Sequence, residues 1–395
     1  MTDGEAGARN GAPEDAAGDP TTRTASRLET ALTRLVGVRH PVVQTGMGWV
    51  AGPRLVGAVA EAGGLGILAS ATMTYPELEA AIKETTARTS APFGVNLRAD
   101  ATDAAERVEL LIRERVAVAS FALAPRRELI ARLMDAGVVV IPSVGAARHA
   151  EKVAAWGADA VVVQGGEGGG HTGGVATTLL LPTVVDAVDI PVIAAGGFFD
   201  GRGLAAALCY GAAGVAMGTR FLLTRESTVP DLVKRRYLES GLDGTVVTTR
   251  VDGLPHRVLR TELVDGLERA GRVRGLARAV ANAARLRGLT GLAWRDMVRE
   301  GRAMRHGRDL TWAQVLMAAN TPMLLRAGLV EGRTDAGVLA AGQVAGVLRD
   351  LPSCAELVAD IVEQAASVLG DLATRVVSEP TASHGATRPR SGLTW

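Results

Sequence analysis

The chain has 395 residues, of which 47% are apolar and 22% charged, and its formal net charge is +1 at pH 7. A chain of this length can bury a large core, while the balanced charge and an aromatic content of 3% argue against nucleic acid as a partner. The two cysteines, Cys209 and Cys354, are too few for a disulfide framework. We therefore expect a globular, cytoplasmic protein.

The two ends of the chain differ in composition from the rest. Residues 1–27 and 374–395 are polar and carry no periodic apolar pattern, which predicts two disordered tails. The first 25 residues contain no apolar segment of the kind that a secretory signal requires. Uncharged apolar runs such as residues 116–124 are too short to span a membrane, so we expect no membrane partner.

Eight short apolar runs, most of them rich in β-branched residues, recur between the tails. Helix-like stretches separate them: the first, GPRLVGAVAEAGG, has proline near its start, apolar residues at helical spacing and a Gly-Gly stop. Buried strands that alternate with amphipathic helices predict a parallel sheet, and eight of them favour an α/β fold of the (β/α)₈ TIM-barrel type over an open sheet. The runs begin at intervals of 22 to 31 residues and are 41–46, 65–70, 93–98, 116–123, 138–145, 160–166, 191–197 and 214–221.

This pattern also predicts the domain organisation. We expect the barrel at residues 28–244, a mainly helical cap subdomain at 245–350, and a helix at 351–373 that packs back on the barrel.

The densest glycine cluster, QGGEGGGHTGG at 164–174, follows the sixth run. Glycine is costly in ordered backbone unless a close approach or a positive φ requires it. Because barrel active sites are built from loops at the carboxyl ends of strands, this loop and His171 should lie at the barrel mouth. Three glycines formally match the dinucleotide motif G-x-G-x-x-G, but the loop does not open a first βαβ unit, so that match is weak. Glu167 could orient the loop or face solvent.

Glycines also lie toward the carboxyl ends of the seventh and eighth runs, in AAGGF (194–198) and AMGTRF (216–221). Barrels often bind phosphate at these two positions through backbone amides and a helix N-terminus. The pair on adjacent strands therefore favours a phosphate-bearing cofactor.

These motifs together resemble the nitronate monooxygenase family of flavin-dependent enzymes, which includes FMN-dependent enoyl reductases. The likeness rests on QTGMGWVAGPRLVGAVAEAGGLGILAS, FGVN, QGGEGGGH, PVIAAGGF and GTRF, which follow in order between residues 41 and 221. The later stretches VDGLPHRVLRT (251–261), AANTPMLL (318–325) and AGQVAGVLRDLPSCAEL (341–357) resemble actinobacterial members.

The resemblance implies that FMN is the cofactor, that residues 28–244 bind it, and that His171 is the catalytic residue. One departure is Gly168, which stands where the family usually has alanine and leaves the loop freer. Gly342 and Gln343 could line the flavin site or form a plain turn. The implied FMN contacts, of which Gly197 and residues 216–219 would hold the phosphate, are Gly46, Met47, Asn96, Gln164, Gly169, Gly197, Ala216, Met217, Gly218 and Thr219.

A histidine beside a flavin can remove an acidic C–H proton, because imidazole titrates near neutrality. Whole-length likeness favours an actinobacterial branch linked to steroid C/D-ring degradation, which implies an FMN-dependent dehydrogenase of a hydroindanone-carboxyl-CoA thioester. A nitronate monooxygenase using oxygen and an enoyl-thioester reductase fed by NAD(P)H remain alternatives, as does a barrel that binds flavin without turnover. Eleven arginines and no lysine in residues 269–308 form either a solvated helix face or a cap that meets the phosphates of coenzyme A.

Other histidines point to no further centre. His256, in GLPHRV, could approach the mouth, whereas His40, His149 and His306 carry no functional pattern. No Cys, His, Asp or Glu grouping has metal-ligand spacing, so we predict no metal. The expected partner is a small-molecule substrate, and a homo-oligomer is compatible with the sequence.

Overall fold

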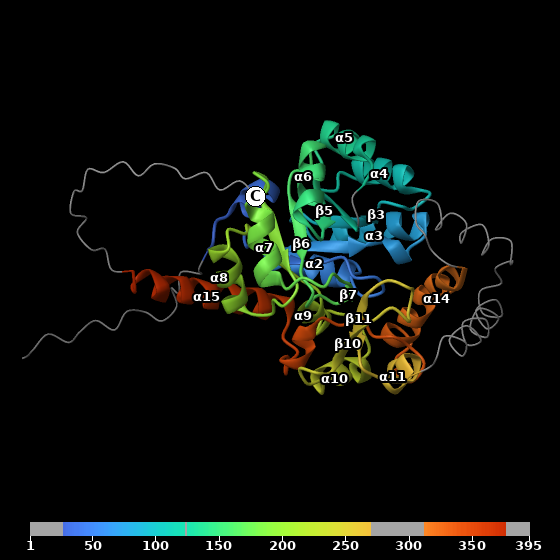
Figure 1. Ribbon diagram of the computed structural model, residues 1–395. Helices are drawn as coiled ribbons and strands as arrows, with labels where there is room; N and C mark the ends of the chain where they lie inside the picture. Colours follow the sequence, from blue (N-terminus) through green and yellow to red (C-terminus); the bar gives the residue numbers. More distant parts are fainter. Residues whose placement is uncertain (1–26, 123–124, 270–311, 377–395) are drawn as a thin grey trace, which may run out of the picture.

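Eight parallel strands close into a barrel (Figure 1), which confirms the predicted fold class. The computed structural model describes residues 27–122, 125–269 and 312–376. The barrel order is β1-β2-β3-β4-β5-β6-β8-β9, and β9 pairs with β1, with Ala216 opposite Val43, to close the sheet. The strands are β1 (Val42–Gln44), β2 (Leu65–Ala69), β3 (Gly94–Arg98), β4 (Val118–Ala122), β5 (Val139–Val144), β6 (Val161–Gln164), β8 (Val192–Ala195) and β9 (Gly214–Met217).

Each barrel strand is buried on both faces, which explains why the runs are apolar without interruption. In β6, Val162 packs with Ile67 and Ile193 in the barrel interior. Its neighbours Val161 and Val163 belong to the core between the barrel and the surrounding helices. This alternation follows from the two-residue period of a strand.

Helices surround the barrel and connect successive strands (Figure 1). Local signals set their ends: before α3, for example, the Glu77 carboxylate accepts the backbone N–H of Thr74 at 2.7 Å, and the two residues form a capping box. The helices up to residue 238 are α1 (Ala31–Val36), α2 (Pro53–Glu61), α3 (Tyr75–Arg88), α4 (Ala104–Arg113), α5 (Arg127–Asp135), α6 (Ala147–Ala155), α7 (Thr177–Val185), α8 (Gly201–Cys209), α9 (Thr219–Leu222) and α10 (Asp231–Leu238), with a 3₁₀ turn η1 (Ser70–Thr72).

The eighth strand is shorter than predicted. The run 214–221 reads as one strand, but β9 ends at Met217, and α9 begins at Thr219. Gly218 already has helical torsion angles, and the two apolar residues that follow, Phe221 and Leu222, pack into the core beside the last helix. Strand β9 therefore ends at Met217, because the helical turn that follows directs Phe221 and Leu222 into the core beside α15.

The chain after the barrel forms a small antiparallel sheet and several helices on one side of the barrel, in yellow and orange in Figure 1. Its sheet order is β10-β11-β7, so a strand from the barrel's glycine loop completes it. These three strands were not predicted from the sequence. The elements are β7 (Gly170–His171), β10 (Thr245–Thr248), β11 (His256–Leu259), α11 (Glu262–Arg269), α14 (Trp312–Leu329) and the 3₁₀ turn η2 (Gln343–Gly346).

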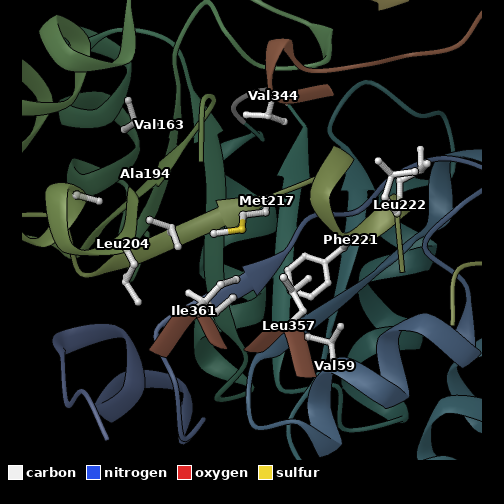
Figure 2. Close-up of a cluster of buried hydrophobic side chains, with 14 of the residues drawn as sticks. Val59, Val163, Ala194, Leu204, Met217, Phe221, Leu222, Val344, Leu357 and Ile361 are labelled. Atoms are coloured by element: carbon white, nitrogen blue, oxygen red, sulfur yellow. The ribbon is translucent and has the colours of Figure 1, made fainter. Parts of the chain in front are cut away.

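The final helix, α15 (Cys354–Ala373), returns to the barrel and lies against α8 (Figure 1). Its Gln364 side chain accepts the backbone N–H of Gly201 at 2.7 Å, and a Cβ at Gly201 would overlap the backbone of α15. Figure 2 shows Leu357 and Ile361 of this helix in the same apolar cluster as Phe221. Helix α15 is thus part of the apolar core that lies between the barrel strands and the surrounding helices.

Several predictions lie outside the described residues: the N-terminal tail to residue 26, the C-terminal tail from 377, and the arginine-rich stretch from 270 to 308. Within the described ranges, no helix combines the length and apolar character that a membrane span requires.

Candidate active site

The glycine loop leaves the barrel after β6 and ends in β7, which pairs antiparallel with β11. His171 stands opposite His256 in this pair, and Gly170 stands opposite Arg257. Gly170 adopts a φ of 73°, a left-handed conformation that favours glycine. The loop thus carries His171 to the junction between the barrel mouth and the small sheet, where 58% of its side chain is exposed.

Three contacts anchor the glycine loop. The Glu167 carboxylate accepts the hydroxyl of Thr177 at 2.7 Å and its backbone N–H at 3.1 Å, at the start of α7. The Arg257 guanidinium donates two hydrogen bonds to the carbonyl of Gly166, at 3.2 and 2.8 Å. The Gln164 amide donates to the backbone carbonyl of the histidine at 2.7 Å. Glu167 therefore orients the loop, which answers the question that the sequence left open.

A buried carboxylate lies beside His171. Oδ2 of Asp252 is 2.5 Å from Nε2 of His171 and 3.5 Å from Nδ1 of His256. The two imidazole rings lie 4.7 Å apart between centroids. Burial by itself would raise the pKa of Asp252, but the interactions with His171 and then His256 outweigh it and hold the pKa of this carboxyl well below its usual range. Asp252 is therefore charged at neutral pH.

These three side chains have the composition of a metal site, since their ligand atoms all lie within 4.8 Å of one another. Two atoms that bind one zinc ion tetrahedrally stand about 3.4 Å apart. The separation between His171 and Asp252 is 2.5 Å, which is the distance of a short, charge-assisted hydrogen bond. The geometry is that of a hydrogen-bonded pair.

The ten predicted cofactor residues lie in barrel strands or in the segments that directly follow them. Gly46 and Met47 follow β1, Asn96 lies in β3, and Gln164 ends β6. The others are Gly169 in the glycine loop, Gly197 after β8, Ala216 and Met217 at the end of β9, and Gly218 and Thr219 directly after it.

The structure brings some of these residues together closely enough to test their fit to a flavin nucleotide. A Cβ at Gly46 would lie 2.5 Å from Cβ of Asn96. This glycine therefore allows the backbone after β1 to approach the Asn96 side chain of β3. A Cβ at Gly218 would lie 3.5 Å from the sulfur of Met47, and Gly197 has a φ of 83°. Glycines thus bring backbone groups and the side chains of Asn96 and Met47 close together at the mouth, a mostly neutral lining of the kind that suits a flavin nucleotide.

Gly169, a predicted cofactor contact, also packs closely against another segment of the chain. A Cβ there would lie 2.5 Å from the backbone nitrogen of Gly342. Gly342 belongs to a segment, residues 340–346, that we call the strap. The backbone N–H of Gly342 donates to Oγ1 of Thr219 at 2.8 Å, and the backbone N–H of Gln343 donates to the carbonyl of Glu167 at 2.9 Å. The strap therefore joins the glycine loop to the start of α9.

A second junction with the cap involves Trp49, which follows the predicted flavin contacts Gly46 and Met47. Trp49 has a φ of 66°, which is unusual for a residue with a side chain. Its indole N–H donates to the carbonyl of Pro322 in α14 at 3.2 Å, and the Arg326 guanidinium lies 5.6 Å from its ring. The mouth loop after β1 is thus held against the cap.

Asp252 was not predicted from the sequence, whereas His256, which could approach the mouth, does lie there opposite His171. Asp252 and His256 lie in VDGLPHRV, which carried the resemblance but no recognisable ligand spacing. Asp252 is 81 positions from His171, so only the pairing of β7 with β11 reveals their contact. The other histidines of the described residues lie elsewhere: His40 precedes β1, and His149 is exposed on α6.

Comparison with known proteins identifies the class to which this fold and site belong. The family model "Nitronate monooxygenase" matches residues 29–109 and 102–364. The chain belongs to the nitronate monooxygenase family and is an oxidoreductase, as the sequence motifs predicted. Members of this family are flavin enzymes, so a flavin is the class of cofactor.

Individual relatives carry names that are more specific than the name of the family. The chain is 74% identical, over 339 residues, to the (3aS,4S,5R,7aS)-5-hydroxy-7a-methyl-1-oxo-octahydro-1H-indene-4-carboxyl-CoA dehydrogenase of Mycobacterium tuberculosis, covering 85% of this chain and 96% of the relative. Identity to the Rhodococcus jostii enzyme of the same name is 70% over 340 residues, or 86% and 96% of the two chains. A probable nitronate monooxygenase of Staphylococcus haemolyticus is 32% identical over 60% of this chain and 80% of its own length.

Solved structures agree on the fold. FabK from Thermotoga maritima superposes with a TM-score of 0.73 at 33% identity, over 88% of this chain and all of FabK. Nitroalkane oxidase from Streptomyces ansochromogenes gives a TM-score of 0.67 at 30% identity, over 87% of this chain and all of the oxidase.

Proposed function

We propose that the chain is an FMN-dependent dehydrogenase that acts on a hydroindanone-carboxyl-CoA thioester in steroid catabolism, with His171 as the catalytic base. The observation that carries this proposal is the 74% and 70% identity, over nearly the full length of both relatives, to two actinobacterial dehydrogenases named for that substrate. The relative named as a nitronate monooxygenase is far more distant, at 32% identity.

The proposed reaction removes a proton and a hydride from adjacent carbons and leaves a double bond beside the thioester. The hydrogen next to the thioester carbonyl is acidic, because the electron pair left behind delocalises onto oxygen. His171 would take this proton, since imidazole accepts protons near neutrality and its side chain is 58% exposed at the mouth. A bound FMN would supply the hydride acceptor.

The FMN-binding residues are part of the proposal. Gly197, Gly218 and Thr219 would hold the phosphate, as the neighbouring carboxyl ends of β8 and β9 favour. The hydroxyl oxygen of Thr219 accepts a hydrogen bond from Gly342, so its O–H can donate to a phosphate oxygen. The ring system would lie near Gly46, Met47, Asn96 and Gln164, whose backbone and amide groups offer neutral hydrogen-bond partners.

The first experiment is spectroscopic. Purified protein should carry, or take up, one FMN per chain, with the absorbance of an oxidised flavin. Anaerobic addition of the hydroindanone-carboxyl-CoA thioester should bleach this absorbance, while an alkyl nitronate should leave it unchanged. Failure to bind flavin after reconstitution would overturn the cofactor assignment, and bleaching by the nitronate alone would overturn the substrate assignment.

A nitronate monooxygenase is the second candidate, because the family model bears that name and the fold matches a nitroalkane oxidase. The same base could act on a nitroalkane, whose proton is also activated by an electron-withdrawing group. Bleaching by the nitronate, with recovery in air, would identify this activity. FabK is a further neighbour, so reduction of an enoyl thioester by NAD(P)H is the third reaction to assay.

We infer a cytoplasmic enzyme whose partner is a small molecule. Cys209 and Cys354 are both free thiols, which suits a reducing compartment. Homo-oligomerisation stays a prediction that sedimentation of the purified protein would test.

A further inference from the structure

Both oxygens of the Asp252 carboxylate are engaged. Oδ1 accepts the backbone N–H of Leu254 at 3.0 Å, which fixes the carboxylate within its own turn. Oδ2 faces Nε2 of His171 at 2.5 Å. The Asp252 side chain is 5% exposed, whereas that of His171 is 58% exposed. A buried carboxylate that is itself held by a backbone hydrogen bond therefore contacts Nε2 of His171, while most of the imidazole ring is accessible.

We propose that Asp252 is a positioning residue that holds His171 through Nε2, so that Nδ1 is the nitrogen that receives the substrate proton. This inference rests on the proposed function, in which His171 is the base. A neutral imidazole carries one N–H, and a carboxylate can only accept. The proton of neutral His171 therefore lies on Nε2, and the lone pair lies on Nδ1.

The proton balance of the step is simple. The bond between hydrogen and the carbon beside the thioester breaks, and the proton forms a bond with Nδ1 of His171. The electron pair stays on the substrate, and a bound oxidised flavin would supply the acceptor for the hydride that the adjacent carbon loses. His171 becomes an imidazolium whose Nε2–H still donates to Asp252. Because the carboxylate is buried, this ion pair is stronger than it would be in water.

His256 completes the environment of the carboxylate from β11. Its side chain is 3% exposed, its Nδ1 lies 3.5 Å from Oδ2 of Asp252, and neither ring nitrogen has a hydrogen-bond partner within the described residues. On the side of α14, Thr321 donates its hydroxyl to the carbonyl of Val251, the residue before Asp252. Across the described part of the chain, the titratable groups that act on the carboxyl of Asp252 are His171 and His256.

The test is Asp252→Asn, compared with Asp159→Asn. Asp159 is half-buried and accepts the backbone N–H of Val140 at 2.8 Å, but it lies at the opposite end of the barrel, before β6. We expect Asp252→Asn to lower kcat on the order of 100-fold with little change in KM, and Asp159→Asn to keep wild-type values. Asp252→Glu, which keeps the charge, should recover part of the loss.

The split between kcat and KM separates positioning from simple support of the fold. Asp252→Asn should keep the flavin content and the KM of the wild type while its kcat falls. Wild-type kcat in Asp252→Asn would overturn the proposal. If Asp252→Asn fails to fold, the comparison passes to Asp252→Glu, whose longer side chain should lower kcat.

A third readout needs no turnover. In protein labelled with ¹⁵N-histidine, the resonances of His171, assigned by their loss in His171→Ala, should report the Nε2–H form near pH 8. The Nδ1–H form in the wild type would contradict the proposal even if the thioester is the substrate. If His171 has the Nε2–H form but the thioester does not react, the inference about Asp252 holds and the proposed substrate is wrong. Stoichiometric zinc binding that depends on Asp252 would replace the hydrogen-bonded pair with a metal site.

Discussion

The backbone N–H of Gly342 donates a 2.8 Å hydrogen bond to Oγ1 of Thr219, 123 positions earlier in the chain. The next strap residue, Gln343, donates to the carbonyl of Glu167. Two adjacent residues of the strap therefore bind both the glycine loop and the start of α9, which the proposed FMN would contact. Changes that push the strap away should affect cofactor binding without touching the chemistry of His171.

Gly169→Ala makes that displacement. The Cβ of the new alanine would lie 2.5 Å from the backbone nitrogen of Gly342, so the backbone of the strap would have to shift. We expect flavin affinity to fall and the free energy of unfolding to drop by about 1–3 kcal/mol, as measured by flavin fluorescence titration and denaturant unfolding. The matched control is Gly173→Ala, in the same loop, where a Cβ meets nothing within 4 Å. Equal losses of flavin affinity in Gly169→Ala and Gly173→Ala would show that the effect comes from the flexibility of the loop and not from the contact with the strap.

Gly46→Ala tests the opposite side of the mouth. The new Cβ would lie 2.5 Å from Cβ of Asn96 and would push that side chain off its present position. Flavin affinity should fall at least tenfold, because both residues are proposed to contact the ring. Gly145→Ala, which follows β5 and has free space around its Cβ, should bind flavin as the wild type does. Normal affinity in Gly46→Ala would remove Asn96 from the cofactor site.

His171→Ala should separate chemistry from cofactor binding. Because the side chain of His171 is largely exposed and its ring contacts Asp252, its removal should leave the flavin spectrum intact. Turnover should fall about 10²- to 10⁴-fold, the range typical of a lost general base. His149→Ala, at an exposed position on α6, should keep full activity. Retained turnover in His171→Ala would mean that the base is another group.

The two thiols should differ sharply in reactivity. Burial raises the pKa of Cys354 to about 12, so at pH 8 its reactive thiolate form is scarce, while Cys209 is exposed. A colorimetric thiol assay should therefore count one rapid thiol per native chain and two after unfolding in guanidinium chloride. Cys209→Ser should abolish the rapid reaction. A rapid second thiol in the native protein would mean that the junction between α15 and the barrel opens readily.

Much of the barrel was predictable because its signals are local. Strands buried on both faces must be apolar throughout, and the stretches between them carry helical spacing and recognisable ends, such as the capping box of Thr74 and Glu77. The error at β9 has the same origin: residues 218–221 look like a strand, but Phe221 packs against α15. That choice depends on a helix more than a hundred residues later in the chain.

The small sheet of β10, β11 and β7 had no comparable signal. Its strands are four, four and two residues long, too short for a two-residue period to stand out. β7 consists of Gly170 and His171, and glycine is depleted in strands. This pairing forms because the cap lies against the barrel mouth.

The sequence by itself determined that the protein is a (β/α)₈ barrel with a glycine-rich loop and His171 at its mouth, because strand burial and the order of strands place that loop. Only the tertiary structure decided which groups surround the histidine. Asp252 and His256 approach it through the β7–β11 pair, and the strap reaches Gly169 and Thr219 from the end of the cap. Hydrogen bonds across 81 and 123 positions depend on how two parts of the chain pack, and no local pattern of residues encodes that packing.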